Sequence, residues 1–138
     1  MQMAQYFLAA GSLIFLLLGG LHLYYTFFSN KFLPRDPAAQ NEMSNTSPRL
    51  TRQTTMWKAW VGFNASHSLG AIFFGAVTLV LATDLFAVLQ QSVVLPVIIL
   101  ITLIFYLFLA RAYWFRIPFA GILLSSICFL IAFILMFT

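Results

Sequence analysis

Residues 93–110 read VVLPVIILITLIFYLFLA, a stretch without a single charged side chain. About 18 or more apolar residues in an α-helix are long enough to cross the hydrocarbon core of a bilayer. Comparable apolar runs occupy residues 6–29, 57–83 and 118–138. The quoted stretch therefore belongs to a pattern of four predicted membrane spans.

The composition supports the same interpretation, since 62% of the 138 residues are hydrophobic, 7% are charged and the mean hydropathy is +0.97. Backbone polar groups in lipid must pair internally, and the runs lack the alternating pattern of barrel strands, so the spans are predicted to be helices. Four spans and one polar loop take up this sequence and leave no soluble catalytic domain. The predicted fold is an all-α bundle of four transmembrane helices in a single membrane domain.

The expected helices cover about residues 6–29, 48–83, 93–116 and 118–138, and a cytoplasmic loop covers about 30–47. The second helix is predicted to begin before the membrane does, because Ser47 is a suitable N-cap and Pro48 is favoured at the first helical position. The very short link between the third and fourth helices predicts that these two are antiparallel neighbours.

The basic residues predict the orientation of the chain. Between the first and second runs lie Lys31, Arg35, Arg49 and Arg52, with Lys58 at the start of the second run, and between the third and fourth lie Arg111 and Arg116. Cytoplasmic loops retain positive charge, so both termini are predicted to lie outside. Attraction of this basic rim to anionic lipid headgroups accounts for the net charge of +4, and no nucleic-acid partner is expected.

Small residues recur at helical spacing and are predicted to form the helix contacts, because close packing rather than water drives association in lipid. The faces that carry them consist of Gly11, Phe15, Gly19, His22, Thr26 and Ser29 on the first helix, Gly62, Ser66 and Gly70 on the second, and Gly121, Ser125, Cys128 and Ala132 on the fourth. Contacts with other membrane subunits, or within a homo-oligomer, are the alternative. The third helix has no such stripe and is expected to face lipid broadly.

Polar residues inside a span are costly and are candidate functional sites. His22 and His67 are predicted to share one layer near mid-membrane, because each lies about 12–13 Å from the cytoplasmic end of its span at 1.5 Å per residue. Asn64 is three residues from His67 on the same helix face. Tyr25 and Arg111 are expected in the same cytoplasmic half of the membrane.

Four interpretations of this polar centre remain open. The histidines hold helix register as satisfied core residues, or they line a pocket for a lipid, a quinone or another amphiphile, or they hold a haem or metal, or they move protons or ions. The aromatic wall of such a pocket would come from Trp57, Trp60, Tyr24 and Tyr25, with Arg111 or Lys58 near an anionic head. Ion movement is disfavoured because the spans contain no mid-membrane carboxylate.

The candidate ligand-binding residues are His22, His67, Asn64, Tyr25, Trp57, Trp60 and Arg111. His22 and His67 are also the candidates for a metal, although no further ligand at their depth completes a zinc or copper site. No catalytic residue is predicted, because the chain has no metalloprotease His-Glu motif, no Ser-His-Asp arrangement and no phosphate-binding loop.

The segments GGLHLYYT (19–26), PRD (34–36) and WKAWVGFNASHSLG (57–70) resemble those of small four-helix bacterial membrane proteins with no assigned activity. The resemblance implies a four-span fold and a place in the bacterial inner membrane. The expected function is that of a small non-enzymatic binding or accessory component, acting through intramembrane contacts with lipid, an apolar ligand or a larger complex. The alternative is a membrane redox or enzymatic protein that uses His22 and His67 around a haem, metal or quinone.

Overall fold

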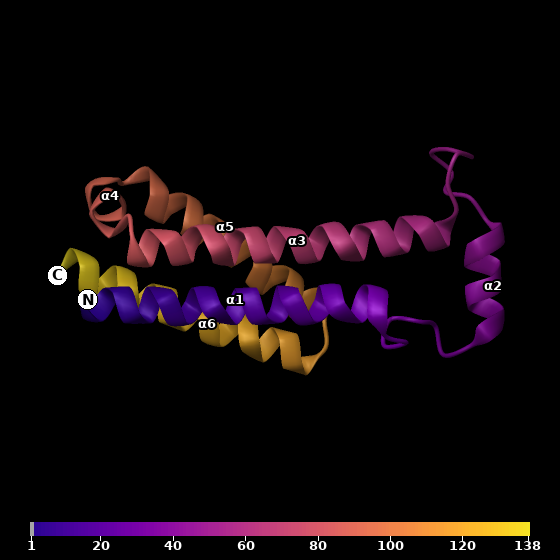
Figure 1. The fold of residues 1–138 in the computed structure, drawn as a ribbon, viewed down its shortest axis with the longest axis horizontal. Helices are drawn as coiled ribbons and strands as arrows, with labels where there is room; N and C mark the ends of the chain where they lie inside the picture. The colour runs from indigo at the N-terminus through magenta and orange to yellow at the C-terminus, as the bar shows by residue number, and fades with distance from the viewer. Residues whose placement is uncertain (1) are drawn as a thin grey trace. The chain divides into compact units, whose positions relative to one another are not determined.

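The computed structural model describes residues 2–138, and the chain is helical over most of that length (Figure 1). The helices are α1 (Met3–Phe28), α2 (Pro37–Asn45), α3 (Met56–Thr83), α4 (Phe86–Gln91), α5 (Val94–Tyr113) and α6 (Arg116–Phe137). Four of them, α1, α3, α5 and α6, are long and apolar enough to cross a membrane, and residues 2–138 contain no strand. The all-α fold is confirmed, with four helices that could span a membrane.

The chain packs as two compact units. The first contains the described residues up to Leu18 together with Ala71–Thr138, and the second contains Gly19–Gly70. Each unit has its own set of contacts. The prediction of a single membrane domain stays a prediction.

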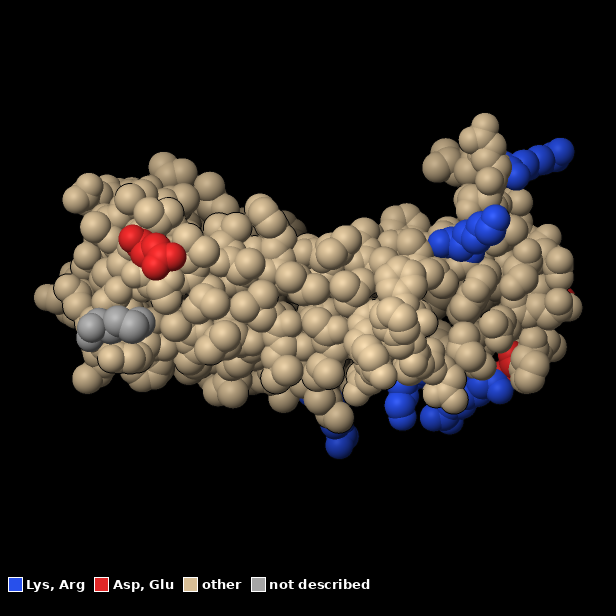
Figure 2. Space-filling model, in the orientation of Figure 1, with Lys and Arg blue, Asp and Glu red and all other residues tan. Residues whose placement is uncertain are grey.

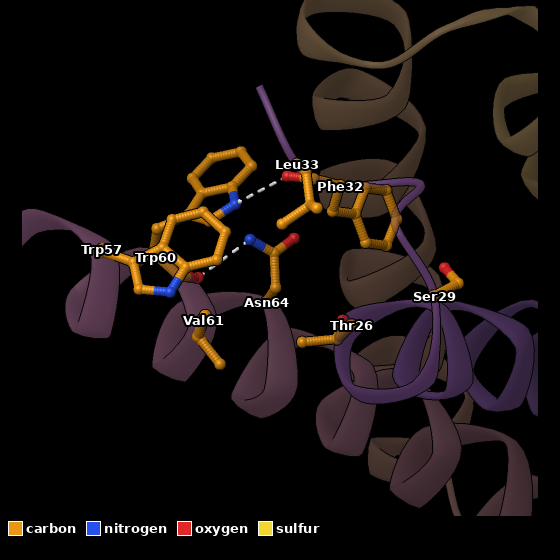
Figure 3. A pocket seen from close by; sticks show the side chains of 8 residues that line it. All are labelled: Thr26, Ser29, Phe32, Leu33, Trp57, Trp60, Val61 and Asn64. Carbon is orange, nitrogen blue, oxygen red and sulfur yellow. Dashed lines mark hydrogen bonds between the residues drawn. The ribbon is translucent and has the colours of Figure 1, made fainter. Parts of the chain in front are cut away.

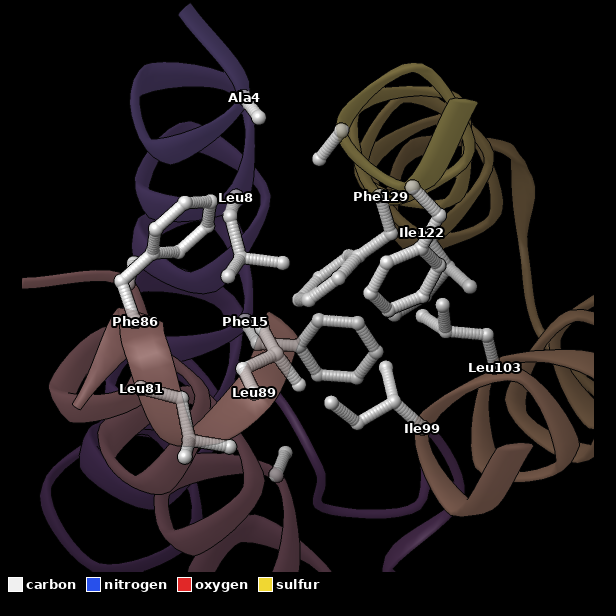
Figure 4. Packing of buried hydrophobic residues seen from close by; sticks show 14 of the residues in the cluster. Ala4, Leu8, Phe15, Leu81, Phe86, Leu89, Ile99, Leu103, Ile122 and Phe129 are labelled. Atoms are coloured by element: carbon white, nitrogen blue, oxygen red, sulfur yellow. The ribbon is translucent and has the colours of Figure 1, made fainter. Parts of the chain in front are cut away.

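Aromatic rings form the centre of the first unit (Figure 4). The Phe15 side chain is fully buried, and its ring centroid lies 4.7 Å from that of Phe74 and 5.1 Å from that of Tyr106. Both pairs meet edge to face, the arrangement that the charge distribution of aromatic rings favours. Phe129 is also fully buried and adds a fourth ring, 5.8 Å from Phe74. The first unit is therefore held by aromatic contacts between α1, α3, α5 and α6.

Small residues allow close helix approach in this unit. A Cβ atom added at Gly11 would lie 2.8 Å from the Phe129 ring, and one added at Gly75 would lie 2.8 Å from the carbonyl oxygen of Ser12. The Ser125 hydroxyl donates to the carbonyl of Gly11 over 2.8 Å. The predicted packing role of the small residues on the first and fourth helices is confirmed at these positions.

The predicted packing stripe of the second helix was wrong for contacts within the chain. Gly62, Ser66 and Gly70 are exposed, and a Cβ added at Gly62 would have no neighbour within 4 Å. The small residues that α3 buries are Ser68, Ala71, Gly75, Thr78 and Ala82. Both sets repeat at helical spacing. The rotation of α3 about its own axis decides which set is buried, and the spacing does not determine that rotation.

The start of the second span also differs from the prediction, which placed it at residue 48. Pro48 begins a turn, with the Thr51 amide donating to the Pro48 carbonyl over 3.2 Å. The span itself begins at Met56, where the Thr55 hydroxyl accepts from the Lys58 amide over 3.3 Å and acts as the N-cap. Residues 48–55 are therefore outside the helix, and the predicted helical extension is wrong.

Smaller differences concern the connections. The 84–92 connection contains α4, whose Phe86 and Leu89 side chains enter the buried core. The 30–47 loop contains α2, which Asp36 caps by accepting from the Ala38 amide over 2.9 Å. α5 ends at Tyr113 rather than 116, and α6 begins at Arg116, with Pro118 in its first turn.

The surface of the long helices is apolar. Figure 2 shows basic side chains projecting around the α2 segment, whereas the visible surface along the helices is almost entirely uncharged. α5 buries the smallest share of its residues among the four long helices, 22%. This share agrees with the predicted broad exposure of the third span, and its contact with lipid stays a prediction.

Candidate functional site

The second unit joins α1 to α3 through a polar pair. The Nε2 atom of His22 lies 2.9 Å from Oδ1 of Asn64, and Nδ2 of Asn64 donates to the Trp60 carbonyl over 2.9 Å. Because only the amide nitrogen can donate to that carbonyl, the amide oxygen faces His22 and accepts. The proton of His22 is therefore assigned to Nε2, and the imidazole donates to Asn64.

The second histidine adjoins this pair. The ring centroids of His22 and His67 are 5.4 Å apart, with the planes at 72° in an edge-on contact. The two imidazoles therefore lie in one layer, as predicted, and their rings meet. Two imidazoles and an amide in adjacent spans are an unusual concentration of polar groups for apolar helices.

Phe32 covers the polar pair, although it lies beyond the end of α1. Its ring centroid is 4.4 Å from that of His22, and its carbonyl accepts a 3.3 Å hydrogen bond from Nε1 of Trp60 (Figure 3). The Tyr25 ring lies further out, 6.4 Å from Phe32. The segment after α1 thus folds back, and a hydrogen bond from Trp60 holds it against α3.

Phe32 was not among the predicted site residues. The available signal was the apolar pair Phe32-Leu33, which stands between Lys31 and Pro34 at the start of an otherwise polar loop. An apolar pair in such a loop indicates a local packing contact, but the sequence does not name its partner.

A small cavity of about 20 Å³ lies between the folded-back segment, α1 and α3. This volume is sufficient for about one water molecule. Thr26, Ser29, Phe32, Leu33, Trp57, Trp60, Val61 and Asn64 line it (Figure 3). Its two hydroxyls donate to the carbonyls of their own helix, that of Thr26 to His22 and that of Ser29 to Tyr25. The Ser29 oxygen also accepts from the Lys31 amide over 3.2 Å, and each hydroxyl oxygen has a further lone pair suited to accept from a bound polar group.

An open groove of about 380 Å³ adjoins the cavity. Its lining residues are Lys31, Phe32, Leu33, Pro34, Met43 and Trp60. Phe32, Leu33 and Trp60 line both spaces. The groove is mostly apolar and has one charged lining residue, and the cavity beside it carries hydrogen-bonding groups. Together they suit a molecule that has both apolar and polar parts.

Six of the predicted site residues lie in the second unit: His22, His67, Asn64, Tyr25, Trp57 and Trp60. Arg111 belongs to the first unit, where it is exposed in the last turn of α5, so its predicted place in the same cytoplasmic half as the histidines stays a prediction. Lys58 is exposed, and the basic residue that lines the groove is Lys31.

The geometry does not fit a haem held by both histidines. The rings of His22 and His67 are in edge contact, which leaves no gap for a porphyrin between them, and Nε2 of His22 is engaged by Asn64. Residues 2–138 contain no group of three or more His, Cys, Asp or Glu side chains placed to bind a metal ion.

Comparisons with protein-family models, with curated proteins and with solved structures find no match to this chain. The resemblance to small four-helix bacterial membrane proteins therefore stays a prediction, and the function is argued from the site.

Proposed function

We propose that this chain is a non-enzymatic binding component of the bacterial inner membrane that holds a membrane amphiphile in the groove beside Trp60. The observation that carries the proposal is that the two spaces adjoin and share three lining residues. Phe32, Leu33 and Trp60 line both the apolar groove and the small cavity, whose other lining residues include Thr26, Ser29 and Asn64. A ligand in the groove therefore has an apolar surface along its length and hydrogen-bonding groups at one end.

The position of the groove suits a lipid-like ligand. Trp57 and Trp60 lie in the first two turns of α3, and tryptophan is enriched where spans meet the headgroup region. The groove volume of about 380 Å³ is within the range of about 300–1,000 Å³ that small-molecule sites occupy. Burial of an acyl chain against Phe32, Leu33 and Met43 contributes about 25 cal/mol per Å² removed from water.

Lipid retention tests this function. The protein is purified in mild detergent and analysed by native mass spectrometry, and we expect one bound lipid per chain. Trp60→Ala removes a groove wall and is expected to lower lipid occupancy several-fold. Phe63→Ala is the matched control, because Phe63 is 74% exposed on the same helix and does not line the groove. Equal retention by both variants would contradict the proposal.

The proposal includes an orientation with both termini outside. It is supported by the placement of all seven Lys and Arg residues in, or in the helix turns next to, the two connections that this orientation makes cytoplasmic. In a Cys128→Ala background, Ser44→Cys is expected to react with a membrane-impermeant maleimide only after the cells are opened. Ser92→Cys, in the opposite connection, is expected to react in intact cells. The reverse pattern excludes this orientation.

The alternative function, a redox or enzymatic protein, rests on the contact between the His22 and His67 rings. A haem between them does not fit, and a quinone is the redox ligand that the lipid-retention experiment can also detect. The same mass spectrum distinguishes the two functions, because a quinone and a phospholipid differ in mass. Loss of a quinone in His22→Leu would favour the alternative.

A further inference from the structure

We infer that the groove selects an anionic glycerophospholipid, with the ammonium of Lys31 paired to its headgroup. This inference rests on the proposed function, because it names the amphiphile that the groove holds. The groove has one charged lining residue, Lys31, and five uncharged ones. An acyl chain fits the uncharged part, and the ammonium meets the phosphate at the side of the groove.

The walls of the groove come from three elements. Lys31, Phe32, Leu33 and Pro34 follow α1, Met43 lies on α2 and Trp60 lies on α3. The hydrogen bond from Trp60 to the Phe32 carbonyl ties two of these walls together. Met43 is unbranched and flexible, so the third wall adapts to acyl chains of different shape.

The Lys31 backbone is held in place beside this groove. Its amide donates to the Ser29 hydroxyl over 3.2 Å, and the Ser29 hydroxyl donates to the Tyr25 carbonyl over 3.0 Å. The backbone that carries Lys31 is thus fixed to the last turn of α1, while the side chain is exposed. A flexible four-carbon stem allows the ammonium to follow a headgroup.

The charge of the surrounding segment favours an anionic partner. Residues 29–58 contain five basic residues and two acidic ones, Asp36 and Glu42, a net charge of +3 (5 − 2). The Asp36 carboxylate caps α2 by accepting from the Ala38 amide. Basic side chains near an anionic leaflet are attracted to it, so this segment concentrates anionic lipid where the groove opens.

A competition between two lipids tests the inference. Purified protein is mixed with equimolar phosphatidylglycerol and phosphatidylcholine, and bound lipid is counted by native mass spectrometry. We expect phosphatidylglycerol to be retained about fivefold over phosphatidylcholine, equal to about 1 kcal/mol for one lysine near an anionic headgroup. Lys31→Gln is expected to abolish the preference, and Lys31→Arg to keep it.

Arg52→Gln is the matched control, because it removes the same charge from the same segment at an exposed position outside the groove lining. We expect it to retain the preference for phosphatidylglycerol. An equal loss in Arg52→Gln and Lys31→Gln would mean that general surface attraction selects the lipid, which overturns the inference. Millimolar inorganic phosphate is expected to leave the lipid bound, and its displacement of the lipid would also overturn it.

The result separates two failures. Equal retention of the two lipids by wild-type protein, with Trp60→Ala still lowering retention of both, refutes the headgroup selection and leaves the amphiphile site standing. Lipid binding that Trp60→Ala leaves unchanged refutes the proposed function itself. Circular dichroism and size-exclusion chromatography of each variant show that a lost preference is not a lost fold.

Discussion

Replacing His22 and Asn64 by leucine, singly and together, tests the hydrogen bond that joins α1 to α3 at the candidate site. The double-mutant cycle isolates the coupling free energy of the pair, because contacts that only one residue makes cancel. The contact of His22 with Phe32 and the bond of Asn64 to the Trp60 carbonyl are lost on both sides of the cycle.

The expected coupling follows from the geometry. Hydrogen bonds between spans of a membrane protein contribute about 0.6 kcal/mol on average and at most about 1.7 kcal/mol. The His22–Asn64 bond is 2.9 Å long, and the Asn64 amide is already oriented by its bond to Trp60. Little side-chain entropy is lost on forming the bond, so we expect a value in the upper part of that range, about 1–1.7 kcal/mol.

The measurement is the free energy of unfolding of the four proteins in mixed micelles, obtained by titration with dodecyl sulfate and followed by circular dichroism. A parallel cycle of His22→Leu with Ser66→Ala is the control, since the Ser66 hydroxyl donates to the Phe63 carbonyl of its own helix. Its coupling is expected to be zero within error. A His22–Asn64 coupling below about 0.3 kcal/mol, the usual error of additivity, would refute the assignment of this bond.

Two further predictions concern packing and use the same titration. Gly75→Ala is expected to lower the free energy of unfolding by about 1–3 kcal/mol, because its Cβ would lie 2.8 Å from the Ser12 carbonyl oxygen, whereas Gly62→Ala, with no neighbour within 4 Å, leaves stability unchanged or slightly raised. Equal changes in the free energy of unfolding at the two glycines would contradict the assignment of the Gly75 side of α3 as its packing face. Ser125→Ala is expected to cost about 0.6–1.7 kcal/mol, since the Gly11 carbonyl loses a donor from another helix, and a neutral result would exclude that bond.

Local rules were enough for some helix boundaries and not for others. Ser47-Pro48 and Thr55 both satisfy the pattern of a helix start, and the predicted start of the second helix was placed at the first of them. The structure begins α3 at Met56, whose amide donates to the Thr46 carbonyl over 2.8 Å, directly after the end of α2. That contact depends on α2, so a reading of residues 47–56 alone does not find it.

The candidate site was predictable in part for a similar reason. The layer shared by His22 and His67 follows from counting residues along two antiparallel spans, which needs only the helical rise. The contact of Phe32 with His22 requires the chain after α1 to fold back, and the lining of the groove by Lys31 and Met43 requires α2 to be placed as well. Counting along helices does not position a loop.

By itself, the sequence determined that this chain is helical and has four segments long and apolar enough to span a membrane. The length and hydropathy of a segment are local properties, and they alone decide whether it can cross a bilayer. Only the tertiary structure decided how the helices are rotated, which small residues α3 buries, and which loop residues cover the polar pair. The physical reason is that rotation and loop placement depend on side chains meeting between elements. Hydropathy is nearly the same on every side of an apolar helix, so it carries no information about which side meets a neighbour.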